Sequence, residues 1–287
     1  MILGINPTVD YAFKHLLGGE ATRPILMNVV DSVLQPAPGH HISDIELLNP
    51  FNPKEALDDK LSILDIKARD QSGRQFNIEM QMLAFRYYEK RILYYCARLH
   101  QQQLHEGQDY LELKPTISIS FLDHVLFPQA TDYHLHFRLL EGSHHFPFTE
   151  DMEFHILELT KFVKSAAELS SGLDIWLYFL RHAEKMDTES LPAALQQQPL
   201  VLRAVEELKM LTQTDLERER YEARRKAQLD YNTALKVARM EGEKIGLIHA
   251  FERLLKHPET PTEELTRLPL EDLDRLADDL QARLKQR

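Results

Sequence analysis

The spacing of apolar side chains along the chain has two periods, one typical of helices and one typical of strands. Up to about residue 165, helical spacing predicts helices over 9–17, 25–34 and 85–105, the first with Thr8 as its N-cap. Alternation of apolar and polar residues predicts strands over 42–48, 116–121, 133–139 and 152–159. This mixture of elements indicates an α/β fold.

Strand-like alternation ends near residue 165, and only helical spacing follows it. The predicted helices cover residues 173–180, 200–211, 215–255, 262–267 and 270–284. The segment 215–255 contains no proline, so we expect one long helix there, weakened at Gly242 and Gly246. We therefore expect three regions: a core over 1–165, a helical extension over 166–214 and a C-terminal helical region over 215–287.

The clearest local pattern is a β-hairpin over residues 61–81. Two strand-like runs, LSILDIKA and QFNIEMQ, flank a turn at residues 70–73. A three-residue connection that ends in Gly73 would pair Asp70 with Arg74, so the numbers of facing residues would sum to 144. The facing pairs are then Ile63 with Gln81, Asp65 with Glu79, and Lys67 with Asn77.

Two acidic side chains on facing strands are unusual, because their charges repel. Facing residues on one side of a hairpin have Cβ atoms about 4.5–5.5 Å apart, and the sequence neighbours of Asp65 and Glu79 are apolar, as in a core. A divalent cation would relieve the repulsion, and carboxylate oxygens suit Mg²⁺ or Mn²⁺. The alternative is a solvated strand face on which Asp65 pairs with Lys67 or Arg74.

The order and spacing of these residues resemble the PD-(D/E)xK nuclease superfamily, and more closely its Rpn family of recombination-promoting nucleases, also described as transposases. The matching segments are NPTVDYAFK (6–14), SILDIKARD (62–70), Gly73, NIEMQ (77–81), RILYY (91–95), and Gly107 with Tyr110. The resemblance covers residues 6–125 well, and more loosely the helical tail with EGE at 241–243 and Gly246.

The resemblance implies a restriction-endonuclease-like mixed-sheet α/β core with a helical C-terminal region. It also implies hydrolysis of DNA phosphodiester bonds with Mg²⁺, or with another divalent cation such as Mn²⁺ or Ca²⁺. The metal ligands of the superfamily fall on Asp65 and Glu79, with a main-chain carbonyl beside Glu79.

The lysine position of the superfamily falls on Gln81, a residue usual at this place in the Rpn family. A glutamine can orient a water molecule but brings no positive charge. We therefore expect the side chain of Lys67 or Lys14 to supply the positive charge. Asp10 on the first helix is the candidate outer carboxylate.

The formal charge of the chain is −11, from 34 basic and 45 acidic residues, which excludes a polybasic nucleic-acid coat protein but not a nucleic-acid enzyme. Residues 86–98 contain four basic residues and one acid, a net charge of +3. The predicted DNA contacts are Lys14, Arg86, Lys90 and Arg91. A solvated helix face is the alternative, and we expect Tyr87 and Tyr94 to pack in the core.

Other residue types exclude several classes of site. The single cysteine, Cys96, excludes an intrachain disulfide and favours a reducing, cytoplasmic location. No apolar run approaches the roughly 18 residues of a membrane span, and no glycine-rich phosphate loop indicates ATP binding. His134 and His136 share a strand face, but no third ligand follows at a recognisable spacing, so the sequence predicts no zinc site.

The leading hypothesis is a metal-dependent DNA endonuclease linked to recombination or mobile elements. Two alternatives are a phage-defence or toxin-like effector with the same chemistry, and a degenerate fold that only binds DNA or a partner. Strand transfer has the least support. The mixed charges of residues 217–244 indicate an exposed or coiled-coil helix, so we expect homo-oligomerisation or regulation through the C-terminal helices.

Overall fold

In the part of the chain that the structure describes, six strands form one mixed sheet in the order β1-β4-β5-β6-β8-β7. This computed structural model describes all residues except 50, 53–61, 64, 85–86, 212 and 286–287. The strands are β1 (Ile45–Leu48), β4 (Ile66–Asp70), β5 (Gln75–Gln81), β6 (Thr116–Leu122), β7 (His134–Arg138) and β8 (Met152–Glu158). Strands β5, β6 and β8 run parallel, and every neighbouring pair that involves β1, β4 or β7 is antiparallel.

The predicted first strand of the hairpin is divided into two short strands. A separate two-stranded sheet joins β2 (Phe51–Asn52) to β3 (Ser62–Ile63), and the strand of the main sheet begins only at Ile66. Ile63 therefore pairs with Phe51, and the predicted pairing of Ile63 with Gln81 is wrong. The change of partner between Ile63 and Ile66 leaves Asp65 outside both ladders.

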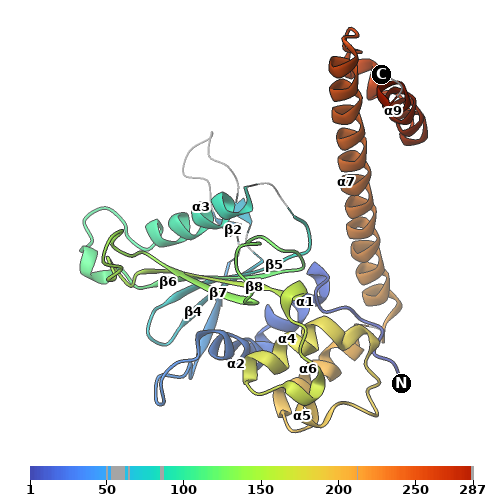
Figure 1. Cartoon of the computed structure of the whole chain (residues 1–287). Coiled ribbons are helices and arrows are strands. Elements are labelled where there is room, and N and C mark those ends of the chain that lie inside the picture. Colours follow the sequence, from blue (N-terminus) through green and yellow to red (C-terminus); the bar gives the residue numbers. More distant parts are fainter. Residues whose placement is uncertain (50, 53–61, 64, 85–86, 212, 286–287) are drawn as a thin grey trace. The chain divides into compact units, whose positions relative to one another are not determined.

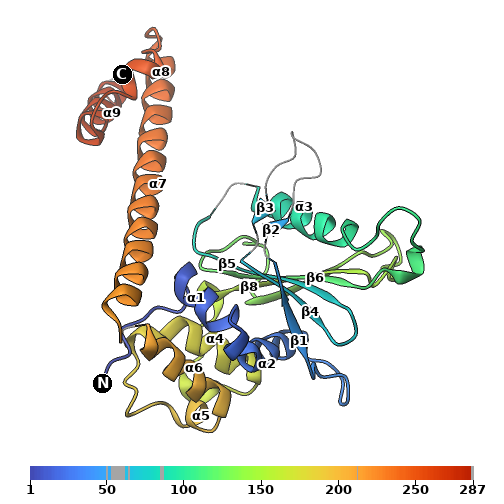
Figure 2. The same ribbon diagram turned by 180° about the vertical axis from the view of Figure 1, so that it is seen from behind.

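Helices cover both faces of the main sheet (Figures 1 and 2). One face carries a layer of four helices: α1 (Asp10–Leu17), α2 (Arg23–Leu34), α4 (Gly172–His182) and α6 (Pro199–Met210). The opposite face carries α3 (Tyr88–Gln101). Because both faces are covered, every residue of β6 is buried, as expected for a central strand in a parallel arrangement.

Side-chain alternation assigns each strand residue to one of the two layers. Phe76, Ile78, Ile117, Ile119 and Phe121 belong to the large core with the four helices. The opposite side of the sheet contributes Leu122 and Ile156 to a smaller cluster, where they meet Tyr88 and Ile92 of α3. The polar residues of β5 that carry the predicted chemistry therefore lie on the α3 side.

The first helix begins one residue later than predicted, and Thr8 is not its cap. The N-cap position is Val9, which makes no side-chain capping bond. Thr8 instead donates from its amide and its hydroxyl to Asn6 Oδ1, at 3.0 and 2.7 Å. The helix is stabilised by burial of its apolar stripe, Ala12, Phe13, Leu16 and Leu17.

The chain divides into two compact units, Met1–Arg224 and Arg225–Arg287. Within the first unit, α4 and α6 pack in the same core as α1 and α2, so the helical stretch 166–214 and the sheet share one hydrophobic interior. The remaining short helices of this unit are η1 (Glu20–Thr22), η2 (Tyr110–Glu112), η3 (Leu159–Lys161), η4 (Ala166–Glu168), η5 (Ala183–Lys185) and α5 (Ala193–Gln196).

Helix α7 (Asp215–Leu255) has the predicted bounds and continues across the division between the units. Its first turns belong to the first unit, where Tyr221 is fully buried and its hydroxyl accepts a hydrogen bond from the Asn6 amide at 2.8 Å. The second unit has its own small core, in which residues of α7 pack against α8 (Thr262–Leu265) and α9 (Leu270–Lys285). Among the described residues, none of the helices has the length and apolar character needed to cross a bilayer.

Candidate active site

The turn between β4 and β5 is held by one buried carboxylate. Asp70 Oδ1 accepts hydrogen bonds from the Ser72 amide and hydroxyl and from the Arg74 amide, at 3.0, 2.8 and 2.9 Å. Gly73 has a φ of +88°, a conformation that glycine adopts without steric cost. The strands pair Ile66 with Ile78 and Lys67 with Asn77, which confirms the predicted register in which partner numbers sum to 144.

Asp65 lies one residue before β4 and is held against β5 by its side chain. Past the end of the ladder, Asp65 Oδ2 accepts a hydrogen bond from the Met80 amide at 3.0 Å, as a strand carbonyl would. The side chain is 22% exposed. The expectation that Asp65 sits within a continuous strand is therefore wrong, but the carboxylate still lies beside the residue that follows Glu79.

Glu79 lies in β5 on the α3 side of the sheet and is only 3% exposed. Its Oε1 accepts from Asn77 Nδ2 and its Oε2 accepts from the Tyr88 hydroxyl, both at 3.1 Å. Burial, and then the negative charge of Asp65, raise the pKa of the Glu79 carboxyl, while these two hydrogen bonds and the charge of Arg91 oppose the rise. The two predicted metal ligands are thus electrostatically coupled.

Lys14 of α1 contacts both other acidic residues of the predicted site. Its Nζ lies 3.1 Å from Asp65 Oδ1 and 3.7 Å from Asp10 Oδ2. Burial disfavours the charged amine, but the carboxylates of Asp65 and Asp10 outweigh that effect and raise the pKa of Lys14. Lys14 is therefore a firmly held positive charge, and it brings Asp10 into the same group of side chains.

Lys67 and Gln81 share the strand face of Asn77 and Glu79, because Lys67 pairs with Asn77 and side chains alternate along β5. Burial, and then the charge of Arg69, lower the pKa of Lys67. Lys67 and Lys14 are the two candidates to supply the positive charge that Gln81 lacks. Of these two, Lys14 is consequently the one better stabilised in its charged form. Gln81 is half-buried at the end of β5.

A polar strip under α3 was not recognised from the sequence as part of the site. Asn77 Oδ1 and Ser118 Oγ are buried and have no hydrogen-bond partner among the described residues. Ser118 of β6 pairs with Asn77, so the two unpaired oxygens face the same side. Buried oxygens of this kind are usually satisfied by ordered water. The strand alternation at 116–121 was the available signal, because it puts Ser118 and Ser120 on one face.

The predicted DNA contacts on α3 divide into two groups. Lys90 is exposed, with Nζ 4.9 Å from the ring centroid of Tyr87. The guanidinium of Arg91 lies over the rings of Tyr88 and Tyr95, at 5.6 and 5.3 Å, and its charge acts on Glu79, so it is turned toward the site. Arg86 lies outside the described residues.

Tyr87 and Tyr94 do not pack in the core, contrary to expectation. They are 55% and 44% exposed, whereas Tyr88 and Tyr95, one position further along, are buried. Both pairs have the spacing of seven residues, so the spacing by itself does not determine which pair faces the sheet. Arg98 Nη1 donates to the Tyr94 hydroxyl at 3.2 Å, which places a basic residue beside an exposed aromatic ring.

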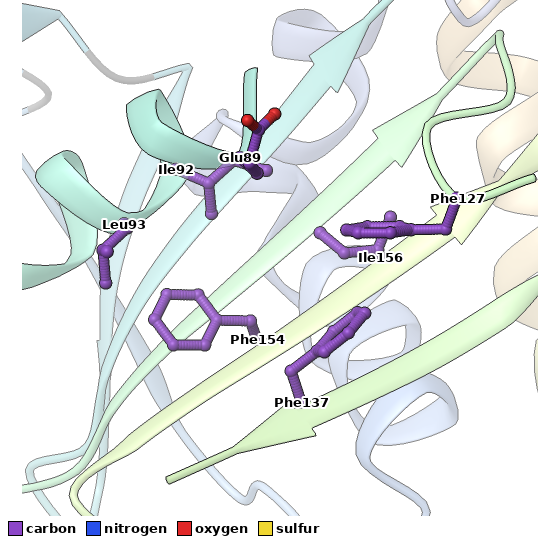
Figure 3. A pocket seen from close by; sticks show the side chains of 7 residues that line it. All are labelled: Glu89, Ile92, Leu93, Phe127, Phe137, Phe154 and Ile156. Carbon is purple, nitrogen blue, oxygen red and sulfur yellow. The ribbon is translucent and has the colours of Figure 1, made fainter. Parts of the chain in front are cut away.

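An apolar pocket lies on the same side of the sheet but contains none of the predicted site residues (Figure 3). Its lining side chains are Glu89, Ile92, Leu93, Phe127, Phe137, Phe154 and Ile156. Glu89 carries the single titratable group among these lining side chains, so no other titratable group faces it in the pocket. The candidate chemistry therefore lies with the acidic residues near the end of β5, not in this pocket.

Comparison with known families identifies the chain. The family model described as "PD-(D/E)XK nuclease family transposase" matches residues 7–238, most of the first unit and part of α7. The chain belongs to this family. Searches of curated proteins and of solved structures found no match. The mixed six-stranded sheet with helices on both faces is the restriction-endonuclease-like fold of a PD-(D/E)XK nuclease, and a nuclease-type function follows from membership.

The donor set of this PD-(D/E)XK protein fits a divalent cation. Asp65 and Glu79 supply oxygen ligands of the kind that Mg²⁺ and Mn²⁺ prefer. Burial, and then the charge of Asp65, raise the pKa of Glu79, and a bound cation would favour its ionised form. The unpaired oxygens of Asn77 and Ser118 next to Glu79 also require hydration, and Mg²⁺ usually keeps several waters.

The raised pKa of Glu79 predicts that the isosteric variant Glu79→Gln is more stable than the wild type in the presence of a chelator at pH 7. A carboxyl whose pKa is raised by folding stabilises the fold at pH below its ordinary value of 4.5, and this contribution is lost as pH rises through the raised pKa. A tenfold change in the proton affinity of one carboxyl corresponds to about 1.4 kcal/mol of unfolding free energy, and each kcal/mol to about 2–4 °C in Tm. Thermal unfolding between pH 4 and 8 measures the difference.

The advantage of Glu79→Gln is expected to shrink as the pH falls, because the wild-type carboxyl then becomes protonated. Glu46→Gln on β1, which removes an exposed carboxylate paired with Arg69, is the matched control and should show no such trend. A wild type at least as stable as Glu79→Gln at pH 7 would contradict the raised pKa.

Proposed function

We propose that this PD-(D/E)XK protein is a divalent-metal-dependent DNA endonuclease that hydrolyses phosphodiester bonds during recombination or the movement of mobile elements. The observation that carries the proposal is the meeting of Asp65, Glu79 and Lys14: two coupled carboxylates, one of them buried, with a lysine 3.1 Å from the other. A structural role alone would not favour a buried carboxylate beside a second negative charge.

Asp65 and Glu79, with a main-chain carbonyl beside Glu79, would hold the cation. Mg²⁺ bound there would supply positive charge to the phosphate and activate the attacking water. The hydrogen bonds from Asn77 and Tyr88 keep the Glu79 carboxylate in one orientation, and the Met80 amide does the same for Asp65. Ligands fixed in this way need no reorganisation when the cation binds.

Lys14 is proposed to take the electrostatic part that the strand lysine has in the superfamily. Gln81 occupies that position and can orient a water molecule, but it cannot stabilise the negative charge that develops on the phosphate. The raised pKa of Lys14 keeps its amine charged at neutral pH. Asp10, 3.7 Å from Lys14 Nζ, positions the amine and acts as the outer carboxylate, while Lys67 lines the same strand face.

DNA is proposed to lie along the exposed side of α3. Lys90 and Arg98 lie there beside the exposed rings of Tyr87 and Tyr94, and basic residues interleaved with aromatic rings suit a phosphate backbone with accessible bases. Tyr87 directly precedes Tyr88, which contacts Glu79, so this surface begins next to the carboxylates. Arg91 and Lys14 would meet the phosphate nearer the site.

The C-terminal helices are proposed to join two copies of the chain. In the second unit, α7 exposes Met240, Leu247 and Leu254, which recur every seven residues. An exposed heptad of apolar residues is the pattern of a helix that packs against a like helix. A second copy of α7 presents the same stripe and is the occupant we propose.

The same chemistry would serve a phage-defence or toxin-like effector, so the proposed link to recombination rests on the transposase description of the family. A reducing, cytoplasmic location is part of the proposal. Cys96 is consistent with it, because the thiol is buried and burial raises its pKa to about 12, which makes it a poor nucleophile for disulfide formation.

Asp65→Asn and Glu79→Gln are each expected to lower the rate of plasmid cleavage by at least about 10²–10³-fold, because each removes charge from the cation site. Lys14→Gln is expected to cost about 10²-fold in kcat. The measurement is nicking of supercoiled plasmid with Mg²⁺, Mn²⁺ or Ca²⁺ and with a chelator. Glu46→Gln is the control and should cleave normally. Wild-type rates in either carboxylate variant, or cleavage in the chelator, would contradict the assignment.

Lys90→Ala is expected to weaken DNA binding for every sequence and to reduce the slope of log K against log salt by about 1, because one phosphate contact is lost. Binding is measured by fluorescence anisotropy with a chelator present, so that the DNA stays uncut, between about 50 and 200 mM salt. The control is Lys185→Ala, which removes an exposed lysine in η5, on the helical layer opposite α3. Equal slopes for the Lys90 variant and the wild type would exclude Lys90 from the interface.

Leu247→Asp is expected to convert a homo-oligomer of the full chain into monomers, because a charge in the apolar stripe would be buried unpaired between the helices. Sedimentation velocity gives the oligomeric state. Leu202→Asp, at a comparably exposed apolar position on α6, serves as the control and should leave the state unchanged. A monomeric wild type, or an unchanged Leu247 variant, would contradict the proposed role of α7.

A further inference from the structure

A second group of metal-ligating side chains lies on the last two strands of the sheet. The antiparallel register of β7 and β8 pairs His136 with His155 and Arg138 with Glu153. Alternation puts His134, His136 and Arg138 on the same face as Glu153 and His155. This group is separated from the nuclease carboxylates, because β6 lies between β5 and β8 in the sheet (Figure 1).

Three ligand atoms of this group have the spacing of a metal site. His136 Nε2 lies 3.0 Å and His155 Nε2 3.5 Å from Glu153 Oε2, and one ligand atom from each of the three residues lies within 4.8 Å of the others. Zinc–ligand bonds of about 2.0–2.1 Å in tetrahedral geometry separate neighbouring ligand atoms by roughly 3.3 Å. The distances from Glu153 Oε2 to the two imidazole nitrogens, 3.0 and 3.5 Å, lie on either side of this ligand-to-ligand separation.

His155 has the environment of a metal ligand. It is 3% exposed, and its Nε2 has no hydrogen-bond partner in the part of the chain that the structure describes. Its other ring nitrogen, Nδ1, lies 2.9 Å from His134 Nε2. A hydrogen bond there fixes the ring and leaves Nε2 directed at Glu153, which is the arrangement that second-sphere partners give to metal-bound histidines.

We propose that His136, Glu153 and His155 form a site for a divalent transition metal, Zn²⁺ above all, with His134 as the positioning residue behind His155. Two imidazoles and one carboxylate are a common ligand set for zinc. The side chains of His136 and Glu153 are 39% and 24% exposed, so a water molecule can complete the coordination from solvent. The site is independent of the proposed nuclease function.

The bound ion would join the edge strand β7 to β8. Edge strands have unpaired backbone groups on their outer side and need other means of support. The rings of His136 and His155 are stacked, with centroids 4.2 Å apart and an angle of 13° between their planes. A metal lies in the plane of each imidazole that binds it, so the two rings would have to tilt toward each other for both to bind one ion.

The test uses the full chain without a histidine tag, stripped with a chelator. Isothermal titration with Zn²⁺ is expected to give one strong site, and Co²⁺ should give the visible absorption of a tetrahedral complex. His136→Ala and Glu153→Gln should each weaken Zn²⁺ binding by more than about 100-fold, and His134→Ala by about 10–100-fold. Circular dichroism establishes that these variants are folded. Because His136 and Glu153 are partly exposed, they are preferred to the buried His155.

Two controls separate this site from other metal binding. His144→Ala removes an exposed histidine outside the proposed ligand set, whose Nδ1 lies 3.1 Å from Glu141 Oε2, and it should keep wild-type affinity. Asp65→Asn should also keep the site, since it alters only the nuclease carboxylates. Absence of a stoichiometric Zn²⁺ site, equal affinity in His136→Ala, or loss only in Asp65→Asn would each overturn the proposal.

Discussion

The register of the β4–β5 hairpin is the constraint on which the candidate active site depends. A slip of one residue would move Glu79 from the α3 side into the apolar layer of Phe76 and Ile78, where its carboxylate would find no polar partner. The register is set at the other end of the hairpin, where Asp70 accepts hydrogen bonds from four donors of Ser72 and Arg74 and Gly73 adopts a positive φ. A buried turn carboxylate thus determines which acidic residues meet near Met80.

The candidate active site depends on helix packing, because a helix carries its positively charged side chain. The strand position of the superfamily's lysine is a glutamine, and the replacement proposed for its positive charge is Lys14 on α1, whose amine lies 3.1 Å from Asp65 Oδ1. Helix α1 is held on the sheet by the contact of Phe13 with Phe121, whose ring centroids are 5.9 Å apart. The geometry of the ion pair with Asp65 is therefore coupled to the large hydrophobic core, and core substitutions near Phe13 would disturb it without touching a charged residue.

The centre and the edge of the sheet carry different kinds of polar residue. In β5 and β6 both faces are covered, so polar side chains such as Asn77, Glu79 and Ser118 are buried and depend on one another or on water. On β7 at the edge, His136 remains partly exposed and accessible to ions from solvent. The same sheet can therefore hold a hard-cation site of carboxylates at its centre and an imidazole site at its margin.

Local pattern determined much of this structure in advance. The alternation over 116–121 and 152–159, the hairpin register and the full extent of α7 follow from periodicity and turn chemistry, which depend only on neighbouring residues. The pairing of acidic residues and the family motifs likewise directed attention to Asp65, Glu79 and Lys14.

Tertiary structure decided everything that depends on a partner far away in the chain. Pairing of β3 with β2 ended the strand before Asp65, so the carboxylate bonds the Met80 amide instead of lying within the ladder. The phase of α3 on the sheet, which the seven-residue spacing of its tyrosines leaves open, buried Tyr88 against Glu79 and exposed Tyr87. The spacing of His134 and His136 did not reveal the proposed metal site because its other two ligands, Glu153 and His155, come from the neighbouring strand, and only the register of β7 and β8 brings them within reach.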